Sequence, residues 1–150
     1  MKKKWAYLIA TGFGSGLAPK APGTFGSLFA SILCYFLQTP LYLSILCILA
    51  SILGIHATSV VTRTKQNKDP GFIVIDEIAG QSLTFLILSV YTSTYISILN
   101  IFLGFLLFRF FDISKIWPAN FFDKKHTPVS VMLDDLVAGC YAGIILIILT

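Results

Sequence analysis

The acidic residues of this chain form a pattern that could bind a divalent metal ion and support phosphate chemistry. Five of them lie in or at the end of apolar segments: Asp76, Glu77, Asp112, Asp134 and Asp135. Ionisable groups at such positions are costly in a membrane unless they are paired, which makes them functional candidates. If the apolar segments are helices that pair as hairpins, all five carboxylates lie at a similar depth on one side of the membrane.

Two basic residues accompany these carboxylates, and they are too few to neutralise them. Arg109 lies three residues before Asp112 on the same helical face, and Lys115 lies three residues after it. Mg²⁺ prefers carboxylate oxygens together with water and substrate phosphate. One or two such ions could clamp a phosphoryl group and activate a water molecule. The pattern predicts a metal site that includes all five carboxylates. The alternatives are interfacial charges that face water and a path for ions or protons.

Residues 12–27, GFGSGLAPKAPGTFGS, are rich in glycine and proline and precede an apolar segment. Free N–H groups at the start of a helix can hold a phosphate. The candidate phosphate-binding residues are Lys20, Gly23, Thr24, Gly26 and Ser27, together with Lys115. The segment lacks the G-K-[S/T] of a P-loop and the glycine spacing of a dinucleotide site. The alternative is an interfacial loop in which Ser27 caps the following helix.

The composition is that of an integral membrane protein. The 150 residues are 56% hydrophobic and 12% charged, whereas an average soluble domain has about 25% charged residues. The apolar segments are residues 27–37, 41–61, 72–91, 95–111 and 131–149. A full span needs about 20 apolar residues, so the first segment is short. We therefore predict an all-α, polytopic membrane helical bundle of about four to five apolar helices with an interfacial Gly/Pro-rich N-terminal loop. It forms a single domain over residues 1–150.

The charged residues are distributed so that all of them can lie on one side of the membrane. No Lys, Arg, Asp or Glu occurs at residues 21–62, 78–108 or 136–150. Basic residues beside apolar segments mark the cytoplasmic side. We therefore expect a multi-pass protein of the inner (plasma) membrane with its site on the cytoplasmic face. The net charge of +4 comes from few charges and does not indicate nucleic-acid binding, and the sequence leaves the oligomeric state open.

For the cysteines and histidines, the sequence favours structural roles over chemical ones. Cys34, Cys47 and Cys140 lie in apolar stretches without a C-x-x-C pair, which indicates small buried residues. His56 is expected to be packed or hydrogen-bonded. His126 is expected to be a solvated loop residue, with a general-acid role as the alternative. Residues 110–125 combine aromatic and basic side chains, a pattern typical of a segment at the level of lipid headgroups.

Four blocks of the sequence, in this order and spacing, resemble the phosphatidylglycerophosphatase A family. They are GFGSGLAPKAPGTFGS, DPGFIVIDEIAGQ, FRFFDISKIWP and VMLDDLVAGCYAG, and they extend from residue 12 to residue 143. The resemblance implies a Mg²⁺-dependent membrane enzyme of phospholipid biosynthesis. Its lipid substrate would be phosphatidylglycerophosphate, from which it would remove the terminal phosphate to yield phosphatidylglycerol.

The motifs of this family fall on the residues selected above from their chemistry. The implied catalytic residues are Asp76, Glu77, Arg109, Asp112, Asp134 and Asp135. The family's Pro-Gly-Thr-x-Gly-Ser loop corresponds to residues 22–27, and its conserved lysine to Lys115. The chain departs from the family at Ile116, where proline is frequent, and at residues 126–130, which are commonly glycine-rich. These departures concern loop details and leave the carboxylates unaffected.

Two other functions are kept as alternatives. A small membrane transporter or channel would use the carboxylates as cation sites, and it would need polar residues that continue across the bilayer. A phosphotransferase acting on a nucleotide-linked lipid would carry a D-G-x-x-A-R motif followed by D-x-x-x-D, which this chain lacks. The chain also lacks the C-x5-R of cysteine phosphatases and the D-x-D of aspartyl-phosphate phosphatases.

Overall fold

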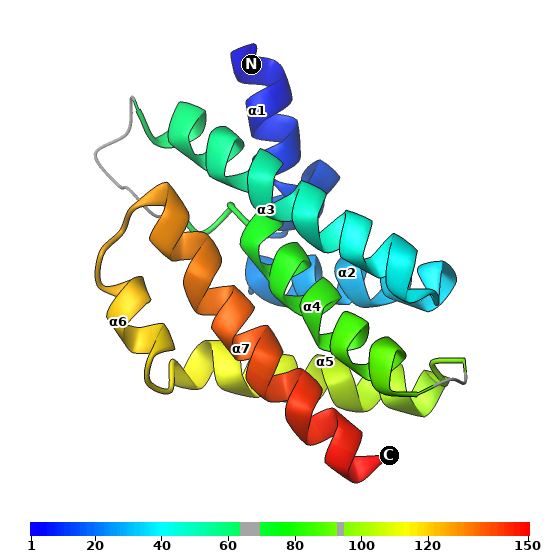
Figure 1. Cartoon of the computed structure of the whole chain (residues 1–150). Coiled ribbons are helices and arrows are strands. Elements are labelled where there is room, and N and C mark those ends of the chain that lie inside the picture. Colours follow the sequence, from blue (N-terminus) through cyan, green and yellow to red (C-terminus); the bar gives the residue numbers. More distant parts are fainter. Residues whose placement is uncertain (64–69, 93–94) are drawn as a thin grey trace.

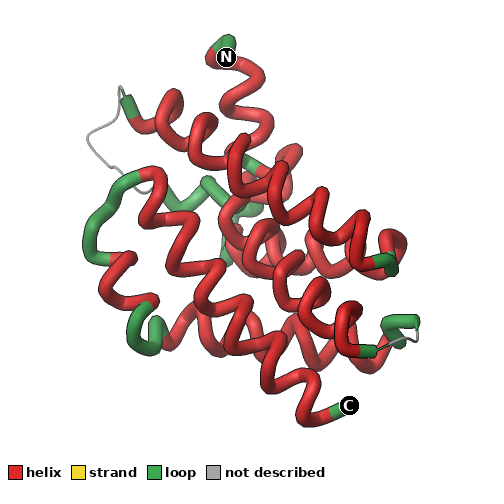
Figure 2. Tube along the Cα trace, in the orientation of Figure 1, coloured by secondary structure: helices red, strands yellow, loops and turns green. Residues whose placement is uncertain are grey.

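The computed structural model describes residues 1–63, 70–92 and 95–150, and every regular element in these ranges is a helix (Figures 1 and 2). The elements in chain order are α1 (Lys3–Ala10), the 3-10 helix η1 (Gly12–Leu17), α2 (Pro22–Leu37), α3 (Pro40–Thr62), α4 (Ile75–Tyr91), α5 (Ile98–Ser114), α6 (Ala119–Asp123) and α7 (Pro128–Leu149). The prediction of an all-α fold is confirmed for these residues. The predicted loop residues Lys65, Lys68, Asp69, Ser93 and Thr94 lie outside the described ranges.

Local sequence signals explain where the two longest helices begin. Both α3 and α7 start with a proline, Pro40 or Pro128, whose missing N–H is not needed in the first turn. The side chain of Thr39 accepts a hydrogen bond from the N–H of Tyr42. Thr127 and Ser130 form a reciprocal capping box at the start of α7. These caps place the helix starts within three residues of the predicted apolar segments.

Helix α4 lies at the centre of the bundle and packs against α7, α3, α2 and α5. Figure 1 shows α4 and α7 side by side along their length. The two backbones touch at a pair of glycines: a methyl group at Gly139 would lie 2.3 Å from the carbonyl oxygen of Gly80. A methyl group at Gly80 would lie 2.4 Å from the carbonyl oxygen of Asp135. This close crossing brings Asp135 of α7 next to the start of α4.

Two helices, α3 and α7, are long and apolar enough to cross a membrane. The most apolar window of α3 is only 33% buried within the chain, so most of its apolar surface faces outward. The exposed residues on α3 include Leu41, Tyr42, Ile45, Ile48, Leu49, Ile52 and Leu53. An apolar outer surface of this extent is typical of a protein that contacts lipid. Helix α2 is also apolar, but its 16 residues make it shorter than these two candidate spans. The count of four to five apolar helices therefore remains a prediction.

Several sequence-based expectations need correction. Helix α2 begins at Pro22, five residues before the predicted start, so Ser27 lies inside the helix and is not its N-cap. Its hydroxyl donates to the carbonyl oxygen of Gly23 at 2.8 Å. Residues 12–17 of the expected loop form η1. Cys34 and Cys47 are buried as predicted, but Cys140 is exposed. His56 is exposed on α3 and is therefore not packed, whereas His126 is exposed as expected.

Candidate active site

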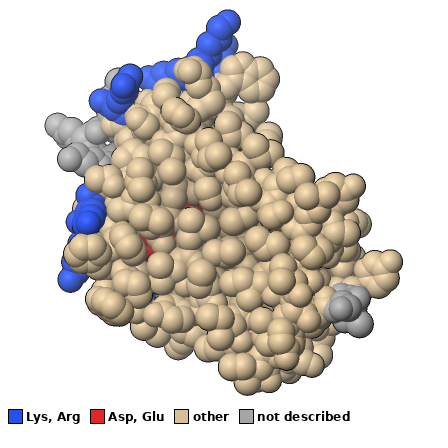
Figure 3. Space-filling model, in the orientation of Figure 1, with Lys and Arg blue, Asp and Glu red and all other residues tan. Residues whose placement is uncertain are grey.

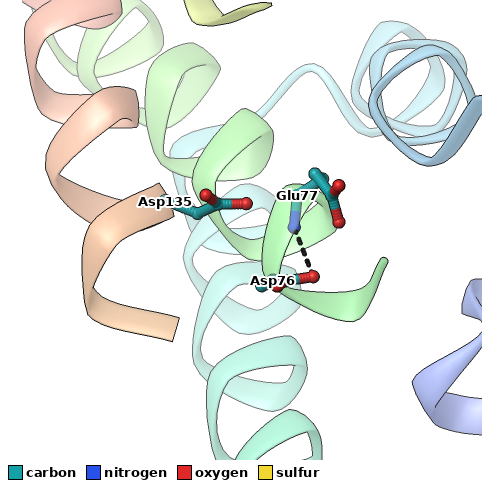
Figure 4. A group of neighbouring side chains, drawn as sticks. All are labelled: Asp76, Glu77 and Asp135. Carbon is teal, nitrogen blue, oxygen red and sulfur yellow. Dashed lines mark hydrogen bonds between the residues drawn. The ribbon is translucent and has the colours of Figure 1, made fainter. Parts of the chain in front are cut away.

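Three carboxylates meet where the start of α4 faces α7. Asp76, Glu77 and Asp135 each offer an oxygen, and these oxygens all lie within 4.8 Å of one another. Figure 4 shows Asp135 reaching from α7 toward the two residues of α4. Asp76 and Asp135 are 7% and 3% exposed, and Glu77 is half-buried. We refer to these three residues as the carboxylate triad.

The local sequence explains why the triad forms here. Helix α4 begins at Ile75, so Asp76 and Glu77 occupy its first turn, where the helix dipole stabilises negative charge. The segment before α4 is anchored because the N–H of Val74 donates to the carbonyl oxygen of Ala10 at 2.9 Å. The glycine crossing of α4 and α7 then sets the position of Asp135 relative to this turn.

Lys115 joins the other carboxylates of the site into one network. Its Nζ lies 3.2 Å from Asp112, 3.5 Å from Asp135 and 3.7 Å from Asp123, and it also donates to Asp134. Burial opposes the charged ammonium, but the surrounding carboxylates of Asp135, Asp112 and Asp134 outweigh it and raise the pKa of Lys115 above its ordinary value. The side chain therefore stays protonated at neutral pH and supplies one positive charge that these carboxylates share.

Arg109 connects this network to α2. Its Nη1 pairs with Asp112 and donates to the hydroxyl of Ser27 at 3.4 Å. Gly23, in the first turn of α2, lies against both Glu77 and Arg109. A methyl group at Gly23 would be 2.2 Å from Glu77 Oε1 and 3.3 Å from Arg109 Nη1. The start of α2 is thus in direct contact with the triad.

The predicted backbone N–H donors of α2 are mostly engaged. The N–H of Thr24 donates to the carbonyl oxygen of Ala21 at 3.0 Å. Gly26 and Ser27 lie further inside the helix, where N–H groups bond to carbonyls four residues earlier. These donors were predicted to be free because the helix was expected to start later. In the described part of the chain, the N–H of Gly23 forms no hydrogen bond, and it remains the available donor.

Lys20 and Gln81 show where the sequence-based interpretation was incomplete. Lys20 is exposed, and no ion pair joins it to the carboxylates within the described residues. Gln81, which received no role from the sequence, is fully buried one turn after Glu77. An uncharged polar residue four positions after a site carboxylate, in an apolar helix, is a signal that could have identified it. The contact of Asp123 with Lys115 was also unforeseen.

The donor set of the site fits a hard divalent cation. All the grouped ligand atoms are carboxylate oxygens, which Mg²⁺ prefers over nitrogen or sulfur. Three carboxylates this close together repel one another when they are ionised. A cation between them would compensate their charge. The residues therefore fit the predicted metal.

Replacement of Lys115 by Met is expected to destabilise the protein, because it leaves several mutually close carboxylates without their shared cation. The side chain of Lys115 is 28% exposed, and water reduces the loss to about 2 kcal/mol. The unfolding temperature of the purified protein should fall by about 4–8 °C. Lys125→Met is the matched control, because the Lys125 Nζ lies over the Phe121 ring at 4.1 Å. An equal change in both variants would contradict the network.

The described residues form an all-helical structure with two helices long and apolar enough to cross a membrane, which is consistent with a membrane protein. Comparisons with known proteins assign its family. The family model for phosphatidylglycerophosphatase A matches residues 8–150. The chain belongs to the phosphatidylglycerophosphatase A family. The resemblance stated from the sequence motifs is confirmed, and so is the prediction that the chain belongs to a family of phosphatase enzymes.

Three curated relatives are similar over most of their length. The phosphatidylglycerophosphatase A of Escherichia coli strain K12 is 37% identical over 150 residues, covering 97% of this chain and 83% of the relative. That of Haemophilus influenzae is 40% identical over 143 residues, covering 93% and 85%. A protein of Bacteroides thetaiotaomicron named putative phosphatidylinositol-3-phosphatase is 36% identical over 146 residues, covering 93% and 89%. No solved structure gives a significant match.

Proposed function

We propose that this protein is a Mg²⁺-dependent lipid phosphatase that hydrolyses phosphatidylglycerophosphate to phosphatidylglycerol and phosphate. The observation that carries the proposal is the carboxylate triad at the start of α4, with Arg109 and the first turn of α2 beside it. This arrangement combines oxygen ligands for a cation with donors for a phosphate in one buried place. The substrate follows from the family and from the names of the Escherichia coli and Haemophilus influenzae relatives.

Asp76, Glu77 and Asp135 would hold the metal ion, with Asp112 and Asp134 next to them in the Lys115 network. A divalent ion at this position supplies Lewis-acid stabilisation of the charge that develops on the phosphoryl oxygens. Phosphoryl transfer depends mainly on positioning and charge stabilisation, and the protein has groups for both. The guanidinium of Arg109 can bind two phosphate oxygens, and the N–H of Gly23 can donate to a third.

The remaining charged groups lie around the triad and have separate proposed roles. Lys115 keeps the carboxylates of α5 and α7 close together, and in the presence of substrate it can also face the phosphate. Lys20, which is exposed on the segment before α2, is proposed to attract the anionic headgroup on entry. Water is the proposed attacking group. The hydroxyl of Ser27 is not proposed as the nucleophile, because it donates to the carbonyl oxygen of Gly23 and accepts from Arg109.

We further propose that the site opens to the cytoplasmic face of the plasma membrane. On the face shown in Figure 3, the basic residues gather along the margin near the N-terminus and α6, while the end of the bundle near the C-terminus is free of them. Positive charge at one end of a set of apolar helices favours the cytoplasmic side for that end. A multi-pass arrangement with the charged end inside accounts for the location of the acidic residues that the structure describes.

The alternative of a small transporter or channel has less support. Helix α4 does contain buried polar residues beyond Gln81, namely Ser82, Thr84 and Ser89. However, their hydroxyls donate to carbonyls of α4 itself. The acidic residues of α4 stop at Glu77 in its first turn, and no charged residue follows in the helix. The rest of α4 therefore lacks the charged groups that line many cation paths.

Replacing Gly23 with Ala is expected to reduce phosphate release by about 10- to 100-fold, because displacing a site group by about 1 Å has an effect of this size. The added methyl group would force the Glu77 carboxylate away from its position, 2.2 Å from the new carbon. The carboxylate is the flexible end of a side chain, so the fold should tolerate the change. The unfolding temperature should stay within about 2 °C of that of the parent, although the rate of phosphate release falls. A parent-like rate would show that Gly23 does not adjoin the reacting groups.

The proposed substrate is tested by phosphate release from three compounds under the same conditions. The purified protein is reconstituted in vesicles that contain phosphatidylglycerophosphate or phosphatidylinositol 3-phosphate, and glycerol 3-phosphate is offered in solution. We expect the first lipid to be hydrolysed fastest and the soluble compound to be hydrolysed poorly. Preference for the inositol lipid, in line with the name of the Bacteroides relative, would overturn the substrate and leave the phosphatase class intact.

A further inference from the structure

Gln81 is a buried residue of α4 whose polar atoms have no hydrogen-bond partner among the described residues. Its exposed fraction is 0%, and both Nε2 and Oε1 are without partners. The hydroxyl of its neighbour Ser82, in contrast, donates to the carbonyl oxygen of Ile78 at 2.6 Å. A buried polar group left unsatisfied costs about 1–3 kcal/mol. The presence of such a group one turn from a candidate active site indicates a role in that site.

Two more buried atoms, on the residues next to Gly23, have no hydrogen-bond partner among the described residues. They are Oε2 of Glu77 and Nε of Arg109. Glu77 precedes Gln81 by four residues, so both side chains project from one face of the helix. Arg109 is adjacent to Glu77, because a methyl group at Gly23 would contact both side chains.

The packing between α4 and α5 places Gln81 at the level of the α5 segment that carries Arg109. A methyl group at Gly80, the residue before Gln81, would lie 2.6 Å from the ring of Phe108, the residue before Arg109. The next residue on the stripe that begins with Glu77 and Gln81 is Phe85, which contacts Gly104 of α5. Gln81 therefore lies on the part of α4 that faces α5, between two points of contact.

The four partnerless atoms form a complementary set of donors and acceptors. Nε2 of Gln81 and Nε of Arg109 donate, whereas Oε1 of Gln81 and Oε2 of Glu77 accept. A buried water can donate two hydrogen bonds and accept two, and it typically forms about three with groups of this kind. One water between Gln81, Glu77 and Arg109 would thus satisfy most of the set.

We propose that Gln81 is a positioning residue of this site, which holds the Glu77 carboxylate and the Arg109 guanidinium in place through a bridging water. The inference rests on the proposed function, because it concerns the same site. When the bridging water binds Oε2 of Glu77, the other carboxylate oxygen, Oε1, stays directed toward Gly23 and the other two residues of the triad. Gln81 itself does not contact the substrate phosphate in this arrangement.

The test measures Mn²⁺ binding to the purified protein in detergent, without substrate, by electron paramagnetic resonance. Gln81→Met keeps the length of the side chain and removes both polar atoms. We expect it to weaken Mn²⁺ binding about tenfold, because residues that orient metal ligands typically contribute 10- to 100-fold in affinity. Gln81→Asn keeps the carboxamide on a shorter side chain and should fall between Met and the parent. Ser82→Ala, the equally buried neighbour, should bind Mn²⁺ as the parent does.

A second measurement separates positioning from a merely structural role. With phosphatidylglycerophosphate as substrate, Gln81→Met should lower kcat more than it raises KM. If Gln81→Met lowers only the unfolding temperature and binds Mn²⁺ like the parent, the inference is overturned. Failure of the parent to hydrolyse the lipid would instead overturn the proposed function, and the comparison of Mn²⁺ affinities among the variants would still decide the role of Gln81.

Discussion

Asp135→Asn is expected to lower the rate of phosphate release by about a thousandfold, a loss of about 4 kcal/mol in stabilisation of the transition state. The substitution preserves the shape of the side chain and removes the negative charge that completes the carboxylate triad. An amide is a weaker ligand for a hard cation than a carboxylate, and metal ions contribute several kcal/mol to reactions of this kind. The rate is measured as inorganic phosphate released from lipid vesicles at saturating Mg²⁺.

Asp123→Asn is the matched control for this prediction. Asp123 also lies near the Lys115 Nζ, at 3.7 Å, but its side chain is 40% exposed and it is not part of the triad. Its variant should keep most of the parent rate, since an exposed ion pair contributes about 0–1 kcal/mol. If both variants lose activity equally, the total negative charge matters and the triad has no special role. If Asp135→Asn keeps the parent rate, Asp135 is not required for catalysis.

Gly139→Ala is expected to lower the stability of the protein by about 3 kcal/mol, at the upper end of the range for overpacking a core. The new methyl group would lie 2.3 Å from the carbonyl oxygen of Gly80 and 3.0 Å from its carbonyl carbon. Both are backbone atoms, which cannot rotate away as a side chain can. Helices α4 and α7 must therefore separate, and the unfolding temperature should fall by about 6–12 °C.

The same separation should also reduce activity, because it moves Asp135 away from Asp76 and Glu77. Gly71→Ala is the matched control, since a methyl group at Gly71 would meet none of the described residues within 4 Å. That variant should have the unfolding temperature and the activity of the parent. A parent-like unfolding temperature for Gly139→Ala would show that the two helices do not cross this closely.

Much of the fold could be predicted from the apolar segments and their boundaries. Thr39-Pro40 and Thr127-Pro128 are strong start signals, and α3 and α7 begin where these signals occur. The start of α2 was predicted too late, because Pro22 was read as part of a loop. A proline in the first turn of a helix is favourable, and the glycines after it are tolerated there.

The location of the candidate site could also be predicted, but the contacts among its side chains and helices could not. The positions of Asp76, Glu77 and Asp135, each about one turn into a predicted apolar segment, indicated that they converge. The network around Lys115 depends on the left-handed backbone at that residue, with φ of 44°, which ends α5. No local pattern predicts this turn for a lysine. The contact of Gly80 with Gly139 depends on the crossing of two helices far apart in sequence.

In the proposed function, the carboxylate triad supports metal-dependent hydrolysis of a phosphorylated lipid. The most direct measurement is the conversion of phosphatidylglycerophosphate to phosphatidylglycerol by the purified protein in vesicles, followed by mass spectrometry. With Mg²⁺ present, we predict equal amounts of phosphatidylglycerol and phosphate, no conversion after addition of EDTA, and recovery when excess Mg²⁺ is restored. An unchanged lipid in the presence of Mg²⁺, or the same conversion with and without EDTA, would contradict the claim.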